Sequence, residues 1–210
     1  MNEATSSVYN AILSNHVNGS SGEKAQSQEL AAFASMSAQK HLFTELRKAA
    51  NHPLLLRTRF LDDQAIDDLS RRLLNYNYFG SDATCTLQLV KNQLEKLSDY
   101  DIHCAAYCLI EENPARREYL EKYTLMQDDM FCSPKFERLR VLLPELVQKG
   151  HRILLFSQWT RVLDLMDNLL EMLDMKFLRL DGSTNVSERQ AIIDTFTNDP
   201  TIPIFLLSTR

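Results

Sequence analysis

The sequence lacks an excess of positive charge. Its 23 lysines and arginines are outnumbered by 28 aspartates and glutamates, which gives a net charge of −5 over 210 residues. Domains that bind nucleic acid without help from other domains are usually basic. Any nucleic-acid contact made by this chain therefore has to come from a local patch, or be completed by residues that are not present here.

The sequence also lacks a long hydrophobic run. No apolar stretch approaches the roughly 20 residues that a helix needs to cross a bilayer. The first ten residues, MNEATSSVYN, contain no basic segment followed by an apolar one, so they do not have the pattern of a secretory signal. We therefore expect no membrane among the partners of this chain.

No two cysteines have the C-x-x-C spacing, although the chain has 4 of them, at positions 85, 104, 108 and 132. Cys104 and Cys108 would share one face of a helix, with His103 beside them, so a metal site is one interpretation. Reduced, buried thiols in an intracellular protein are the interpretation that the spacing favours. We expect no bound metal.

A phosphate-binding loop is missing as well. Gly19 and Gly22 precede Lys24, but no G-K-[ST] sequence follows and no strand pattern comes before them. Both are needed for a loop of that kind. Because residues 15–28 are polar and rich in glycine and serine, we predict a mobile loop over this range.

Helical periodicity dominates the chain up to residue 132. Apolar residues at helical spacing predict helices over 29–50, 61–79 and 83–97. Pro53 should end the first of these, because it disfavours the α conformation at His52. Ser98 or Asp99 is expected to cap a further helix through Leu109. No strand pattern stands out between residues 29 and 130, so this region is predicted to be all-helical.

The pattern changes at Ser133-Pro134, which suits the N-cap and first position of a helix ending near Gly150. Short apolar runs then predict strands over 153–156, 177–180 and 204–207, separated by helices over 161–173 and 187–197. Thr160 is expected to cap the first helix, and Ser187 with Gln190 to form a capping box on the second. Strands that alternate with helices of this length predict βαβ units and a parallel sheet. We therefore predict an α/β fold preceded by a helical region.

Polar residues follow each predicted strand at its carboxyl end. These tips are Ser157-Gln158-Trp159, Asp181-Gly182-Ser183-Thr184 and Ser208-Thr209-Arg210. Ligands of parallel sheets bind beyond this edge, and hydroxyls with free backbone N–H groups suit phosphate oxygens. Arg179 and Arg189 would add positive charge nearby. The same residues could equally be helix caps and turns, and no general acid, base or nucleophile stands out.

Several strings match one family. Residues 150–184, 187–196 and 204–210 closely resemble the second motor lobe of the SWI/SNF-related, helicase-like ATPases, which are DNA translocases with two RecA-like lobes. Residues 46–54 resemble that family's LRK-x-x-NHP-L segment, and residues 133–136 lie where it has S-G-K-[FL]. Residues 8–13 resemble the helix that closes the first lobe. Residues 97–103 are similar to the SMARCAD/Etl subgroup.

The resemblance implies three regions. Residues 1–14 would be the end of the first motor lobe, residues 15–132 a helical protrusion, and residues 133–210 a truncated second RecA-like lobe. It implies DNA-backbone contacts, and a nucleotide contact by Arg210. The residues implied in DNA contact are Ser157, Gln158, Arg179, Gly182, Ser183, Ser208 and Thr209. ATP and Mg²⁺ would be the cofactors of the intact parent, duplex DNA or the nucleosome its partner, and the nucleus its location.

Motifs that phosphoryl transfer requires are absent from the sequence. The phosphate-binding loop and Asp-Glu box of the family's first lobe are missing, as are the glycine-rich end of the last motif and the arginine fingers. We therefore expect a motor fragment that binds no nucleotide and does not hydrolyse ATP by itself. A non-catalytic protein-interaction module derived from such a motor is the alternative. An unrelated α/β enzyme, such as a nucleotide-sugar transferase, is a third. We also expect the strand at 204–207 to expose an apolar flank that favours aggregation.

Overall fold

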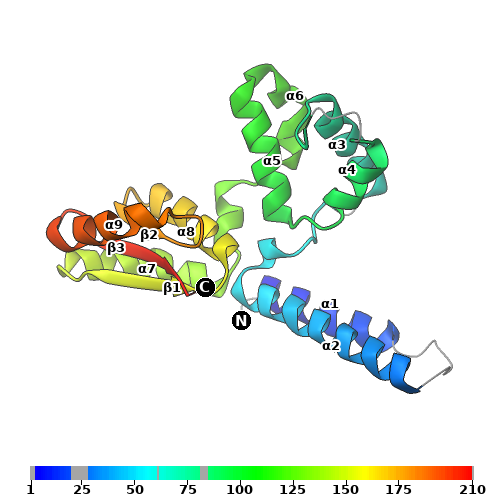
Figure 1. The fold of residues 1–210 in the computed structure, drawn as a ribbon, viewed down its shortest axis with the longest axis horizontal. Coiled ribbons are helices and arrows are strands. Elements are labelled where there is room, and N and C mark those ends of the chain that lie inside the picture. The colour runs from blue at the N-terminus through cyan, green and yellow to red at the C-terminus, as the bar shows by residue number, and fades with distance from the viewer. Residues whose placement is uncertain (1–2, 20–27, 61, 81–84, 210) are drawn as a thin grey trace. The chain divides into compact units, whose positions relative to one another are not determined.

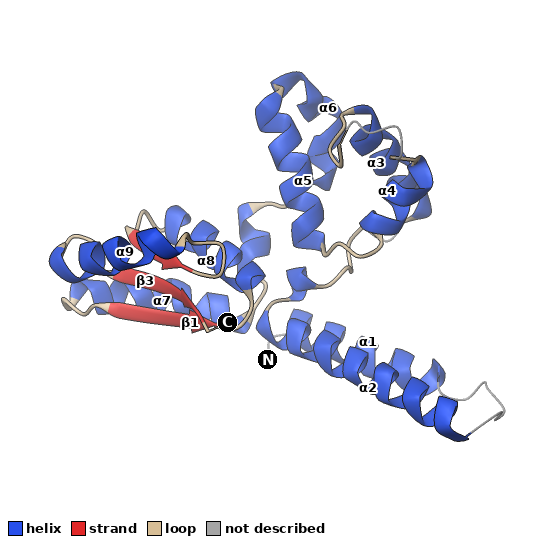
Figure 2. Ribbon diagram, viewed as in Figure 1, coloured by secondary structure: helices blue, strands red, loops and turns tan. Residues whose placement is uncertain are grey.

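The chain divides into two units in a computed structural model that describes residues 3–19, 28–60, 62–80 and 85–209 (Figure 1). The first unit, Met1–Ser133, is called the helical unit below, and the second, Pro134–Arg210, the α/β unit. Figure 2 shows that all the strands belong to the α/β unit, while the described part of the helical unit contains helices and loops.

The helical unit contains both α-helices and short 3-10 helices. They are α1 (Glu3–Gly19), α2 (Gln28–Asn51), η1 (Pro53–Leu55), α3 (Asp63–Asn75), α4 (Leu87–Leu94), α5 (Asp99–Glu112), η2 (Pro114–Arg116), α6 (Arg117–Leu120), η3 (Glu121–Tyr123) and η4 (Gln127–Phe131). The prediction of an all-helical region is thus confirmed for its described part.

The first two helices lie side by side (Figure 1). As predicted, α2 ends before Pro53: His52 is extended, with φ −158 and ψ 129. The prediction of a mobile loop at 15–28 is wrong at its beginning, because α1 continues to Gly19. Residues 20–27, which make up most of that predicted loop, lie outside the described residues.

The core of the helical unit lies between α3, α4, α5 and the segment around α6. Its buried side chains are Leu69, Leu73, Val90, Leu94, Ile102, Ala105, Ala106, Leu109, Ile110, Leu120 and Tyr123. Side-chain caps begin the helices that bring these residues together. Asp62 caps α3 and Thr86 caps α4. Ser98 caps α5 and shares a capping box with Asp101, so the expected cap at Ser98 is confirmed.

The α/β unit is a three-stranded parallel sheet with helices packed on it. Its elements are α7 (Pro134–Gln148), β1 (Ile153–Ser157), α8 (Thr160–Met172), β2 (Phe177–Leu180), α9 (Val186–Asn198) and β3 (Ile204–Ser208). The predicted α/β class and parallel strands are confirmed. The strand order is β1-β3-β2, with Ile153 paired to Ile204 and Phe177 paired to the same residue.

This strand order overturns the expectation for residues 204–207. Because β3 lies between the other two strands, its Ile204, Phe205 and Leu206 are at most 3% exposed. The exposed apolar side chains lie on β1 instead, where Leu154 is 51% and Phe156 61% exposed. Sequence hydrophobicity identified the strands, but it could not say which of them would be central.

The ends of the α/β helices differ in part from prediction. Gly150 has φ +78, and the N–H of the next residue, His151, donates to the Leu146 carbonyl oxygen at 3.0 Å, so Gly150 ends α7 as expected. Thr160 is the first residue of α8 rather than its cap. The predicted capping box on α9 is wrong: the helix starts at Val186, and Gln190 donates to Asp194 at 2.8 Å.

No helix within the described ranges is both long enough and apolar enough to cross a bilayer.

Candidate nucleic-acid interface

The three polar tips lie together at one edge of the sheet. The parallel register pairs Ser157 with Ser208, and the N–H of Thr209 donates to the Ser157 carbonyl oxygen at 3.0 Å. On the other side of β3, Leu180 pairs with Leu207, which places Asp181 level with Ser208. Three segments that are separated in sequence therefore form one continuous rim.

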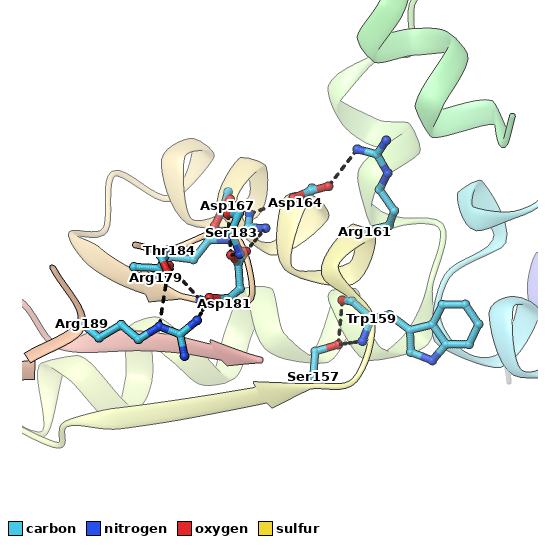
Figure 3. Close-up of polar contacts among 10 residues, drawn as sticks. All are labelled: Ser157, Trp159, Arg161, Asp164, Asp167, Arg179, Asp181, Ser183, Thr184 and Arg189. Carbon is cyan, nitrogen blue, oxygen red and sulfur yellow. Dashed lines mark hydrogen bonds and ion pairs between the residues drawn. The ribbon is translucent and has the colours of Figure 1, made fainter. Parts of the chain in front are cut away.

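The β1 tip is closed by a local turn (Figure 3). The Ser157 hydroxyl accepts the N–H of Trp159 at 3.0 Å and lies 3.0 Å from the Trp159 carbonyl oxygen, to which it can donate. Ser157 is therefore half-buried and engaged within its own turn, while Gln158 between them is exposed. Of the two residues predicted to contact DNA at this tip, Gln158 is the more accessible.

The β2 tip, residues 181–184, is a closed turn built around one carboxylate. Oδ1 of Asp181 accepts the N–H of Ser183 at 2.8 Å and its hydroxyl at 2.6 Å. The Asp181 N–H donates to Oγ1 of Thr184 at 3.1 Å, and the Thr184 N–H donates to the Asp181 carbonyl oxygen at 3.2 Å. These bonds project Gly182 and Ser183 into solvent while Asp181 itself is only 5% exposed.

Arg189 supports this turn from α9. Its Nε donates to the Thr184 carbonyl oxygen at 3.2 Å, and Nη2 donates to that of Asp181 at 3.3 Å (Figure 3). The positive charge expected near the rim is therefore present, but its donors are directed at the turn's own backbone.

Arg179 is surrounded by carboxylates. Its Nε and Nη2 lie 2.8 and 2.6 Å from Oδ2 of Asp181, and Nη1 lies 2.8 Å from Oδ1 of Asp164. Nη1 also contacts Oδ2 of Asp167. Burial alone would lower the pKa of Arg179, but the hydrogen bonds that it donates to the three carboxylates outweigh this effect and raise that pKa above its ordinary value.

The Asp181 carboxylate is held in its ionised form. The hydrogen bonds from Ser183, opposed by burial and supported by Arg179, lower its pKa to about 2. Asp181 is thus already neutralised by partners within the chain at neutral pH. It is a structural anion of the turn, and its chemistry is not that of a general base.

The β3 tip contributes Ser208 and Thr209. Ser208 is half-buried at the end of the central strand, and Thr209 is exposed. Arg210, which the family resemblance links to nucleotide, lies outside the described residues. The rim as described therefore presents Gln158, the Gly182-Ser183 apex and Thr209 to solvent.

Comparison with known proteins identifies the family. Residues 134–210 match the model of the helicase conserved C-terminal domain. The chain is 36% identical over 172 residues to the ATP-dependent helicase fft2 of Schizosaccharomyces pombe, a match covering 81% of this chain and 12% of the relative. It is 39% identical over 168 residues to Protein CHROMATIN REMODELING 19 of Arabidopsis thaliana, covering 80% and 21%. The chain belongs to the SWI/SNF-related, helicase-like ATPase family.

A solved structure from this family shares the fold. The crystal structure of the C-terminal part of the Fun30 ATPase domain matches with a TM-score of 0.78 and 33% identity, over 100% of this chain and 65% of that one. This SWI/SNF-related chain therefore spans about two thirds of that structure. It spans only 12% and 21% of the two sequence relatives, so it corresponds to a small part of proteins of that length.

Two residues that support this SWI/SNF-related rim were not predicted from the sequence. Asp164 and Asp167 lie on α8, outside every tip, yet both contact Arg179. Their spacing of three places them on one helix face, which is the signal that could have identified them. The sequence did not indicate which residue that face would meet, because Arg179 belongs to a different strand.

A metal centre finds no support among the described residues, where no group of three or more histidine, cysteine or acidic side chains has suitable geometry. Cys85, Cys104, Cys108 and Cys132 are all thiols rather than halves of disulfides, but the expectation that they are buried is wrong, because Cys108 is exposed and the other three are half-buried. His103 is engaged elsewhere, since its Nδ1 accepts the N–H of Leu125 at 2.9 Å.

Proposed function

We propose that the rim of the α/β unit contacts the phosphate backbone of duplex DNA, within an ATP-dependent chromatin remodeller of the nucleus. The observation that carries this proposal is the convergence of three strand tips on one edge, with exposed groups at each: Gln158, Gly182-Ser183 and Thr209. Family membership supports it, since one relative is named as an ATP-dependent helicase and another as a chromatin remodelling protein.

The chemistry of the rim suits contacts that do not depend on base sequence. Side-chain amides, hydroxyls and backbone N–H groups all donate to phosphate oxygens and position a protein on the duplex. The charged side chains beside them, Arg179, Asp181 and Arg189, are engaged with each other or with the turn. Because the whole chain carries a net charge of −5, we expect this rim to bind DNA weakly unless a longer protein supplies further contacts.

ATP and Mg²⁺ would act elsewhere in that longer protein. Phosphoryl transfer needs a phosphate-binding loop, metal ligands and a charge-stabilising arginine, and the sequence contains neither the G-K-[ST] loop nor an Asp-Glu pair. The proposed role of this chain is to hold DNA while nucleotide chemistry occurs outside it. Arg210 is the position at which we propose a link to the nucleotide.

Gly182 provides the test of DNA contact. A Cβ added there meets no atom within 4 Å, and Gly182 has no positive φ. Gly182→Ala should therefore leave the free chain unchanged, whereas Gly182→Glu places bulk and negative charge where a phosphate would approach. We expect Gly182→Glu to weaken binding of the 210-residue chain to a fluorescent DNA duplex about tenfold, equivalent to ~1.4 kcal/mol.

A matched control is Thr201→Glu, which adds the same charge at an exposed position just before the amino-terminal end of β3, at the opposite edge of the sheet. If both glutamate variants weaken binding equally, the loss reflects net charge alone and the rim is not the contact surface. Melting curves of the variants should coincide with that of the wild-type chain.

The purified chain is expected to show no ATP hydrolysis above background, with or without duplex DNA. Phosphate release should be measured beside a preparation of the Gly182→Glu variant, purified in the same way. If the rate of hydrolysis stays proportional to the amount of the chain through successive purification steps, the proposal that nucleotide chemistry occurs outside this chain is contradicted.

A further inference from the structure

We propose that Arg179 is a positioning residue: anchored to α8 by Asp164 and Asp167, it holds the turn at residues 181–184 in the shape that meets DNA. This inference rests on the proposed function of that turn. It differs from the role that sequence resemblance implies, in which the guanidinium itself contacts a phosphate. The geometry around Arg179 distinguishes the two roles.

Carboxylates already occupy most of the N–H donors of Arg179. Nε and Nη2 lie against Asp181, and Nη1 lies against Asp164 and Asp167 (Figure 3). All three guanidinium nitrogens thus have carboxylate partners, and the Arg179 side chain is 24% exposed. These four contacts occupy four of the five guanidinium N–H groups. A phosphate could therefore accept from two N–H groups of Arg179 only by displacing a carboxylate from a charge-assisted hydrogen bond.

Asp181 connects Arg179 to the exposed apex of the turn. One carboxylate oxygen, Oδ2, accepts from Arg179 at 2.8 Å. The other, Oδ1, accepts from both the N–H and the hydroxyl of Ser183. A continuous series of hydrogen bonds therefore runs from α8 through Arg179 and Asp181 to Ser183, which the proposed function places against DNA.

Asp164 and Asp167 are about three-quarters buried, with side chains 24% and 25% exposed. Asp167 leaves its Oδ1 buried without a hydrogen-bond partner. Two carboxylates beside a DNA-contacting rim would repel phosphate by simple electrostatics. Their position is understandable if their role is to fix Arg179 rather than to interact with the ligand.

The two roles predict opposite results for Asp167→Asn. If only charge matters, removing a negative charge near the rim tightens DNA binding. If Arg179 positions the turn, the variant loosens Arg179 and weakens binding. We expect a decrease in affinity of about threefold to tenfold for Asp167→Asn, and a similar or larger one for Arg179→Gln, with the fluorescent duplex as the probe.

Salt dependence separates Arg179 from a phosphate contact. Removing one charged phosphate contact reduces the slope of log K against log salt by about one. We expect Arg179→Gln to leave that slope unchanged, because the exposed Gly182-Ser183 apex that a disordered turn would withdraw from phosphate carries no charge. Arg138→Gln, at an exposed position on α7, is the matched charge control. A slope reduced by about one in Arg179→Gln but not in Arg138→Gln would overturn the positioning role.

Amide hydrogen exchange on the DNA-free chain gives a measurement that does not depend on the proposed function. We expect exchange at Ser183 to accelerate in Asp167→Asn and Arg179→Gln, with β3 unchanged. If the wild-type chain binds no duplex, the proposed function fails, and the exchange result alone decides the positioning role. Unchanged exchange at Ser183 overturns it. Should Arg179→Gln fail to fold, Asp164→Asn and Asp167→Asn carry the same test.

Discussion

Lowering the pH from 6.5 to 4 is expected to reduce the free energy of unfolding of the helical unit by about 3 kcal/mol through His52 alone. His52 is fully buried, and burial is the main cause that lowers its pKa from 6.5 to about 4, against a smaller opposing effect of its bond to Met130. The folded state therefore resists protonation of this imidazole over a pH range in which the unfolded chain accepts a proton.

The hydrogen bonds of His52 fix its neutral form. Nδ1 accepts the N–H of Leu54 at 3.2 Å, so the proton of the neutral ring lies on Nε2, which donates to the Met130 carbonyl oxygen at 3.0 Å. Protonating Nδ1 would place its new N–H against the N–H of Leu54, so that two donors would face each other without an acceptor. The contribution is fully present above pH 6.5 and is lost as the pH falls toward 4, because the folded-state pKa lies below the unfolded one.

Urea unfolding followed by far-UV circular dichroism at several pH values measures this effect. His52→Gln should be less stable than the wild-type chain at neutral pH. Its free energy of unfolding should fall much less than that of the wild-type chain between pH 6.5 and 4. Burial also lowers the pKa of His103, so this histidine could contribute to the same pH dependence. The variant His103→Gln, measured in parallel, separates its contribution from that of His52. A wild-type pH dependence that survives unchanged in His52→Gln would show that His52 is not its source.

Asp99→Ala is expected to destabilise the helical unit by about 3 kcal/mol. Asp99 is fully buried at the first position of α5, where its carboxylate accepts from both the N–H and the hydroxyl of Thr58, at 3.0 and 2.9 Å. It also accepts the N–H of Arg59 at 3.1 Å. Alanine would leave these donors without a partner in a site that water does not readily enter.

Asp63→Ala is the matched control, since Asp63 is likewise the first residue of its helix, α3, but is exposed. Both substitutions remove a favourable interaction with the helix dipole, worth less than ~1 kcal/mol at the surface. The difference between the two variants therefore isolates the bonds to residues 58 and 59. Equal losses in chemical denaturation would mean that those bonds contribute nothing.

Local patterns in the sequence were sufficient to predict most of the elements. Residues 177–180 form the predicted strand, and β1 and β3 each extend one residue beyond prediction. Pro53 and Gly150 end their helices as expected, because the backbone preferences of these residues act locally. Periodicity alone predicts the α/β fold class, and the family resemblance adds that the α/β unit is a RecA-like lobe.

What could not be predicted depends on contacts between distant segments. Whether Ser157 binds a ligand or its own turn depends on the path of the chain around Trp159. The partners of Arg179 on α8 follow from the packing of a helix against a strand. Likewise, nothing near Asp99 in sequence shows that it would accept bonds from residues 58 and 59. The DNA contacts assigned to the rim remain predictions.

The strand order has a consequence for the order of folding. β1 and β2 are each hydrogen-bonded to β3 and not to one another, although both precede it in the chain. During synthesis, neither strand can find its partner until residues 204–208 have left the ribosome. Through that interval the apolar face of α8, which contacts β3 in the folded unit, lacks this cover. Nascent chains stalled before β3 should therefore bind chaperones more strongly than those stalled after it.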